Sequence, residues 1–264
     1  MQAAHAEKYN SGWQLNIDNN IFQRYMKDRD YTGGIAFAVS GKRAQSGWLN
    51  VDPVRAWVFN DTGLISHHET DVKKHNVQYG IIFITPDDVT ATEPILDDRP
   101  FASLFYISST ELTFSVSSDV AYRSSFSFGI LGLELAGEIQ RSLHYVTGSD
   151  EAKGWGNQIS AGGEPTAKLS LSAQYKLSAS GNSQTSTYIE GNAGYSTDVN
   201  AAVNWRWGRL NTPWWSFNPS HYDYMAAPAA SVRSIKGSLP EFYIYAGFDW
   251  KYRCLLYTAD AADD

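Results

Sequence analysis

Long stretches of alternating polar and apolar residues run through most of this 264-residue chain. A period of two places every second side chain on the same face of a β-strand. The pattern predicts about nine strands, several of them long, with aromatic residues at many strand ends. The predicted strands cover residues 13–17, 35–39, 77–84, 103–116, 120–131, 167–177, 186–195, 200–207 and 242–252.

Strand length and aromatic placement favour one β architecture. An antiparallel outer-membrane β-barrel has long alternating strands with aromatic girdles at both membrane interfaces. A soluble β-sandwich would also show many strands and turns, but its strands are usually shorter. The sequence therefore predicts an all-β, antiparallel outer-membrane barrel, with the sandwich as the alternative. Candidate girdle residues are Trp205, Trp207, Trp214, Trp215 and Tyr243.

Charge and hydropathy exclude several classes of protein. The formal net charge is −7 and no basic run occurs, which argues against a nucleic-acid-binding surface. Uninterrupted apolar stretches are short, as in residues 80–84, so no helix could span a bilayer. The single cysteine, Cys254, gives no basis for a disulfide or a thiolate metal site.

The two ends of the chain differ from the rest. Residues 4–6 have the small-x-small form of a signal-peptidase site, so residues 1–12 are expected to be a signal-peptide remnant and lead-in. An ordinary disordered N-terminus is the alternative. Residues 254–264 break the strand pattern and resemble a translated adapter, which predicts a non-native tail. Residues 13–253 would then form one incomplete barrel domain.

Three segments do not read as strands. Residues 41–75 are long for a turn and contain a possible short helix over 54–59, while 209–239 predict an ordered loop. Within residues 129–155, a Gly-rich corner leads into a helix-like segment that carries Gln140 and His144. This i, i+4 spacing puts both side chains on one helix face. Neutral histidine can accept a proton from water, although a solvated surface pair is the simpler interpretation.

Two polar clusters flank the first predicted loop. Asp18 and Asn19 end the first strand, and their oxygens are of the kind that calcium prefers, although such residues more often mark a turn. Residues 28–34 contain Thr32 and paired glycines, which also fit a simple strand entry with a bulge. If the N-terminus is periplasmic, both clusters and the helix carrying His144 meet at the outer rim. Convergence of this kind favours an active site.

Together these residues resemble the LpxR-type lipid A 3-O-deacylase family of outer-membrane barrels. The resemblance implies twelve strands, with a site between the wall and an outer-loop helix. It implies calcium-dependent hydrolysis of the ester that holds the 3′ acyloxyacyl group on lipid A. The matching stretches are Asp18 with its Asn neighbours, residues 28–34, residues 98–105, and residues 129–144 with the Gly154-Trp155 pair.

The resemblance also implies residue roles. His144 would be the general base, Gln140 would position water or substrate, and Thr32 would lie beside the scissile ester. Asp18 and Asn19 would bind calcium, and Asp150 would support the metal region or orient His144. The partner would be lipid A in the bacterial outer membrane, with the site at the outer leaflet.

The sequence departs from the family pattern at four places. Asp150 is one methylene shorter than the Glu that the family can carry there. Ile17 replaces a polar residue beside Asp18, Leu133 replaces a proline, and residues 86–97 lack a basic pair for lipid A phosphates. The departures at Ile17 and Leu133 motivate an alternative, a non-enzymatic barrel whose helix plugs or caps the mouth. A Ser-His lipase ranks last because Ser142, at i−2 from His144, faces away on a helix.

Overall fold

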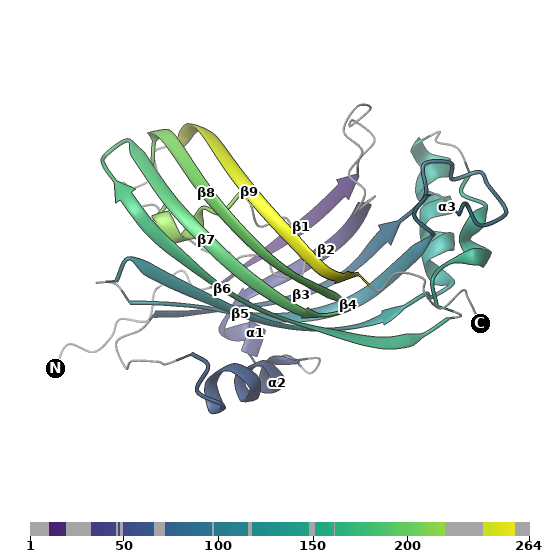
Figure 1. Cartoon of the computed structure of the whole chain (residues 1–264), viewed down its shortest axis with the longest axis horizontal. Helices are drawn as coiled ribbons and strands as arrows, with labels where there is room; N and C mark the ends of the chain where they lie inside the picture. The colour runs from purple at the N-terminus through teal and green to yellow at the C-terminus, as the bar shows by residue number, and fades with distance from the viewer. Residues whose placement is uncertain are drawn as a thin grey trace.

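Nine strands form one antiparallel sheet in which each strand pairs with the next along the chain. The computed structural model describes residues 11–19, 33–45, 47, 50–65, 72–96, 98–115, 118–147, 151–160, 162–219 and 240–256. The sheet is strongly curved, so it has a concave and a convex face (Figure 1). The strands are β1 (Ser11–Asn19), β2 (Gly33–Gly41), β3 (Val72–Ile84), β4 (Ala102–Phe114), β5 (Val120–Leu131), β6 (Glu164–Ala179), β7 (Ser183–Gly194), β8 (Ser196–Arg209) and β9 (Phe242–Leu256).

All nine predicted strands are present, and the prediction of an antiparallel all-β fold is confirmed. Most strands are longer than the pattern indicated. β6, for example, has 16 residues, because strand pairing continues beyond the last alternating side chain. Among the described residues, no helix is long and apolar enough to cross a bilayer.

The two faces of the sheet have opposite chemistry. On the concave face, register places Thr110, Ser125 and Ser170 side by side, and all three are buried. Thr110 donates a hydrogen bond to Ser125 over 3.1 Å. The convex face carries exposed large apolar side chains instead. A polar inside and an apolar outside match a sheet whose outer surface meets lipid. Examples on the convex face are Trp13, Phe37, Phe128, Ile189, Val203, Trp205 and Trp250.

The strand ends define two rims. We call the rim where β1 ends and β2 begins the outer rim, and the opposite one the inner rim. Helix α3 (Leu135–Thr147) and η3 (Gly154–Asn157) follow β5 at the outer rim (Figure 1). The β2–β3 connection at the inner rim contains α1 (Lys42–Gln45), α2 (Asp52–Ala56) and the π-helical turn η2 (Trp57–Asp61). This confirms the short helix predicted within residues 41–75.

The β8–β9 connection folds against the concave face at the inner rim. Its short helix η4 (Trp214–Ser216) carries Trp215, which stacks on Phe114 with ring centroids 4.4 Å apart. Gln174 donates hydrogen bonds to the backbone oxygens of Trp214 and Phe217. The ordered loop predicted over 209–239 is therefore present in its described part, while residues 220–239 lie outside the described residues.

Candidate active site

A glycine corner directs the chain from β5 into α3. Gly132 has φ of 70°, a left-handed conformation that side chains disfavour. Its amide donates to the backbone oxygen of Ser103 over 3.0 Å. A Cβ at Gly132 would also lie 2.7 Å from the Cβ of Ser160. Both the backbone conformation and the lack of space therefore require glycine where the strand turns into the helix.

Helix α3 packs against the convex side of the wall beside the outer rim. Ala136 is fully buried and Ile139 lies one turn away, and both contact an apolar cluster that includes Ile81 and Phe83 of β3. Ile35 of β2 packs on the same cluster. The buried face of α3 therefore meets the wall beside the rim. The cluster also contains Phe101, Phe105, Val89, Ala152 and Trp155.

Gln140 is held by a tryptophan from the segment that follows α3. The indole Nε1 of Trp155 donates to Gln140 Oε1 over 2.6 Å, and Gln140 is 6% exposed. The Trp155 ring is itself fixed by Phe101, at 5.1 Å, and by Phe83, at 6.2 Å between ring centroids. This arrangement sets the side-chain amide plane and directs the NH₂ group of Gln140 away from Trp155.

His144 lies one helical turn beyond Gln140 and is half-buried. The helix confirms the expected i, i+4 placement, which stacks the two side chains on one face. Tyr145, the next residue, is 90% exposed. His144 thus stands at the edge of the packed face, between the buried Gln140 and solvent, where a proton-accepting group can reach water.

Residues 98–105, one of the stretches that match the family, position the aromatic ring against which Trp155 packs. Asp98 accepts hydrogen bonds from the backbone amides of Asp87, over 2.6 Å, and Arg99, over 2.8 Å. Arg99 in turn donates to the backbone oxygen of Thr85. These bonds fix the approach to β4, so that Phe101 meets the indole ring described above. The motif therefore acts here as a scaffold for the helix.

The segment after α3 interlocks with the β3–β4 connection. Lys153 donates its amide to the backbone oxygen of Val89 over 2.9 Å, and Ile159 donates to that of Phe101 over 2.7 Å. Gly154 is needed for this approach, because a Cβ there would lie 2.3 Å from the Phe101 ring. This interlock was not predicted from the sequence. The Gly154-Trp155 pair was the one local feature that could have indicated it.

The remaining predicted site residues are located only in part. Asp18 and Asn19 occupy the end of β1, paired with Gly34 and Gly33 of β2, and their side chains lie outside the described residues. Thr32 and Asp150 are also outside the described residues. The backbone nevertheless brings the end of β1 and the start of β2 to the rim from which α3 departs, as the topology predicted.

The metal side of the candidate site can be judged from its donors. Within the part of the chain that the structure describes, no three His, Cys, Asp or Glu side chains gather to hold a metal. The residues implied for calcium, Asp18, Asn19 and Asp150, offer carboxylate and amide oxygens, which suit that hard cation. Ile17, beside them, is 67% exposed and contributes no ligand.

Replacing Trp155 by phenylalanine tests the support of Gln140. The phenyl ring retains most of the packing, but the buried Gln140 Oε1 loses its donor. An unsatisfied buried acceptor costs about 1–3 kcal/mol, so we expect a loss of that size in the free energy of unfolding. Urea unfolding in micelles would measure it. A change as small as that of the exposed variant Tyr145→Phe would contradict the assigned bond.

The curved sheet, with its polar inside, apolar outside and rim helix, is the architecture of an outer-membrane β-sheet protein with a candidate site at one rim. A family model described as "Outer membrane protein LpxR" matches residues 1–260, and the chain belongs to this family. The structure of LpxR from Salmonella typhimurium has the same fold, with a TM-score of 0.59 and 15% identity over 86% of this chain and 68% of that chain. No curated protein sequence matches the chain significantly.

Proposed function

We propose that this protein is an outer-membrane ester hydrolase that removes the 3′-linked acyloxyacyl group from lipid A. Membership of the LpxR family supports the substrate class. The observation that carries the proposal is the packing of α3, which holds Gln140 and His144 beside the rim where β1 and β2 meet. At that rim the site would face the outer leaflet of the membrane, where lipid A resides.

His144 would act as the general base. Its neutral imidazole takes a proton from water as the water oxygen attacks the ester carbonyl carbon. The bond between that carbon and the sugar oxygen then breaks, and the proton returns from the imidazole to the departing sugar oxygen. The products are a free acyloxyacyl acid and a free sugar hydroxyl. Gln140, fixed by Trp155, would hold the water or the substrate in line for this attack.

Asp18, Asn19 and Asp150 would hold calcium, and Thr32 would lie beside the scissile ester. When bound, the cation would polarise the ester carbonyl and stabilise the oxyanion. The positions of Asp18 and Asn19 at the end of β1 agree with this assignment.

The loop over residues 86–97 limits how the substrate is held. Its sequence contains no lysine or arginine. Hydrogen bonds from the side chain and backbone of Thr90 lower the pKa of Asp88, so this loop remains negatively charged at neutral pH. Arg99, just beyond the loop, lies 3.8 Å from Asp87. The phosphates of lipid A would therefore have to bind to groups outside this loop.

The alternative is a non-enzymatic barrel of the same fold with a structural or binding role. The exposed apolar side chain of Ile17, next to the residues assigned to calcium, favours it. Under this alternative, the helix and Trp155 would stabilise the rim without turning over substrate. The two proposals differ in whether lipid A changes mass.

Mass spectrometry of lipid A would decide between them. The chain would be produced in a bacterial host whose lipid A carries a 3′ acyloxyacyl group and which has no deacylase of its own. We expect isolated outer membranes to lose the mass of that group when calcium is present and to retain it when EGTA is added. An unchanged acyl pattern with calcium, despite protein in the outer membrane, would favour the non-enzymatic alternative.

A further inference from the structure

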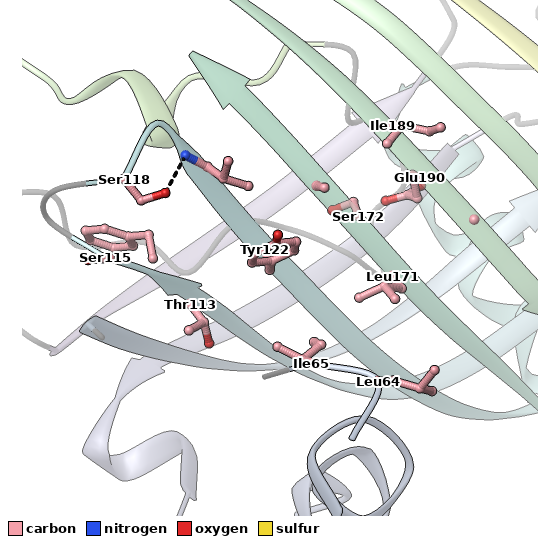
Figure 2. A pocket seen from close by; sticks show the side chains of 14 residues that line it. Leu64, Ile65, Thr113, Ser115, Ser118, Tyr122, Leu171, Ser172, Ile189 and Glu190 are labelled. Carbon is pink, nitrogen blue, oxygen red and sulfur yellow. Dashed lines mark hydrogen bonds between the residues drawn. The ribbon is translucent and has the colours of Figure 1, made fainter. Parts of the chain in front are cut away.

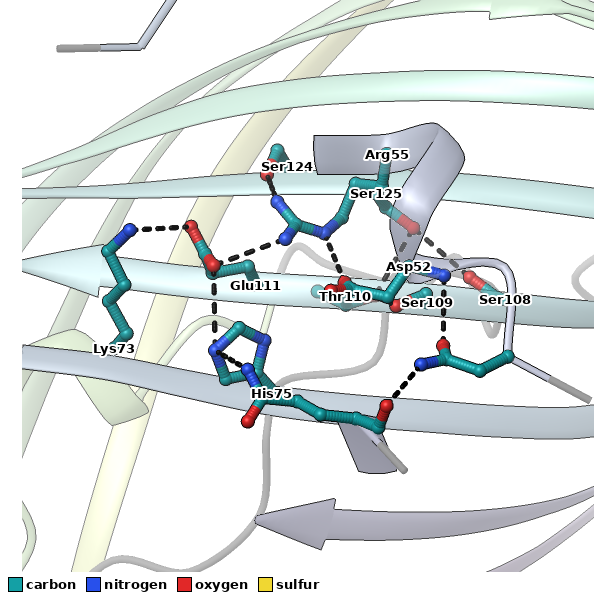
Figure 3. Close-up of polar contacts among 12 residues, drawn as sticks. Asp52, Arg55, Lys73, His75, Ser108, Ser109, Thr110, Glu111, Ser124 and Ser125 are labelled. Atoms are coloured by element: carbon teal, nitrogen blue, oxygen red, sulfur yellow. Dashed lines mark hydrogen bonds and ion pairs between the residues drawn. The ribbon is translucent and has the colours of Figure 1, made fainter. Parts of the chain in front are cut away.

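Helix α2 is fastened to the convex face at the inner rim by a buried ionic cluster. Arg55, 1% exposed, lies 3.1 Å from Glu111 and 2.7 Å from Asp52. It also donates to Ser124 over 2.9 Å, and Ser109 donates to Asp52 over 2.8 Å. Glu111 and Ser124 are paired in register on the convex face. Figure 3 shows how these polar groups surround the guanidinium.

The opposite side of this helical segment is apolar and exposed. Val54 and Trp57, three residues apart, are 41% and 64% exposed, whereas Phe59 is buried. Leu64, just after η2, is 62% exposed, and Ile65 is buried. A helix with one face anchored on the wall and a tryptophan on the other is suited to the membrane interface, where amphipathic indole rings concentrate.

A groove of about 690 Å³ lies between this segment and the convex face (Figure 2). Leu64 and Ile65 form one wall. The floor follows the register row that joins Tyr122, Ala173 and Ile189. The next row contributes Leu171 and Gly191. The groove is hollow because Ala173 and Gly191 have small side chains or none, whereas their neighbours on the same face, Tyr122 and Ile189, have large ones.

The groove is amphipathic along its length. Thr113, Ser115 and Ser118 line it at the β4–β5 turn, which belongs to the inner rim. Away from that turn the convex-face side chains that line it, Leu171, Ala173 and Ile189, are apolar and continue into the exposed apolar convex face that includes Val203. Ser172 and Glu190 also line the groove, but register assigns their side chains to the concave face. Its shape and polarity therefore fit an amphiphile whose polar end lies at the inner rim and whose hydrocarbon lies along the wall.

We propose that this groove binds an acyl chain of a glycerophospholipid from the leaflet at the inner rim. Three observations select this occupant: continuity with the apolar convex face, the polar end at the rim, and the exposed Trp57 in the helical turn that precedes Leu64. The site is at the end of the sheet opposite to α3, so it is separate from the candidate active site. It requires the membrane placement of the family but not hydrolysis of lipid A.

Photo-crosslinking would test the proposal with a defined probe. The whole chain, folded in detergent micelles, would be irradiated with phosphatidylethanolamine that carries a diazirine on one acyl chain. We expect labelling to concentrate on peptides that contain Leu64 or Tyr122. Ala173→Phe should fill the groove and lower this labelling several-fold. Gly191→Leu should do the same, because a Cβ at Gly191 meets no atom within 4 Å and the variant can fold.

Ala167→Phe is the matched control. Ala167 is exposed on the same convex face of β6, but near the outer rim, so its substitution should leave the labelling unchanged. Adding excess lipopolysaccharide should not displace the probe, whereas unlabelled phosphatidylethanolamine should. Uniform labelling of the convex face, or equal labelling of Ala173→Phe and Ala167→Phe, would overturn the proposal. Displacement by lipopolysaccharide would overturn the choice of phospholipid.

Discussion

Replacing His144 by alanine is expected to lower the rate of lipid A deacylation about 100- to 10,000-fold, the usual contribution of a general base. The alanine keeps the helix, since it has the highest intrinsic helix propensity. The loss should therefore appear in turnover without a loss of folded protein. The release of acyloxyacyl acid by folded protein in mixed micelles, followed by mass spectrometry, would measure the rate.

Tyr145→Ala provides the matched control for His144→Ala. Tyr145 is adjacent on α3, is 90% exposed and contributes no assigned group to the reaction. The Tyr145→Ala variant should retain activity close to that of the unmodified protein. Equal activity of the two variants would remove His144 from the mechanism and leave the fold assignment intact.

Replacing Arg55 by methionine is expected to lower the free energy of unfolding by about 3–5 kcal/mol. The substitution keeps an unbranched apolar stem but leaves the Glu111 carboxylate, 2% exposed, without its closest cation. Thr113 still donates to Glu111 over 3.1 Å, which favours the lower end of the range. Burial alone would raise the pKa of Asp52, but the hydrogen bond and charge of Arg55 lower it overall, so this carboxylate also loses its partner.

Two further variants show how much of this cost comes from leaving the buried Glu111 carboxylate without a cation. Arg141→Met breaks an exposed pair with Glu138, in which the side chains are 50% and 66% exposed, and should cost less than about 1 kcal/mol. The double variant Arg55→Met with Glu111→Leu should regain part of the stability, since the buried Glu111 carboxylate is then removed, while Asp52 still lacks Arg55. Urea unfolding of protein folded in lipid vesicles would compare them. A cost for Arg55→Met no larger than that for Arg141→Met would refute the anchoring role.

The strands and their order could be predicted because each depends on a local signal. Alternation identifies a strand, and short polar turns such as residues 180–182 identify the hairpins. The helix over Gln140 and His144 and its arrival at the outer rim followed from counting strands. Strand ends were less predictable, as β1 and β2 show, because backbone pairing continues past the last patterned side chain.

The contacts that position the helices could not be read from local pattern. Trp155 and Gln140 are 15 residues apart, and Arg55 and Glu111 are 56 apart. One signal was present, however. Residues 108–113 are mostly polar on both faces of a strand, which is unexpected for a wall that meets lipid. Such a stretch indicates that something polar covers the convex face, and the structure identifies the cover as α2.

The pairing of every strand with its neighbour in sequence has a consequence for how the sheet is assembled. To add a strand to the sheet, only the connection between that strand and the preceding one has to be closed into a loop. The entropy cost of closing such a loop grows slowly with its length. Every described strand therefore pairs only with its neighbours in chain order, which favours stepwise growth by addition of one strand at a time. We expect the three longest connections, β2–β3, β5–β6 and β8–β9, to be the slow steps in such a sequence. The first two place their helices, α2 and α3, on the wall only after the strands beneath them have paired.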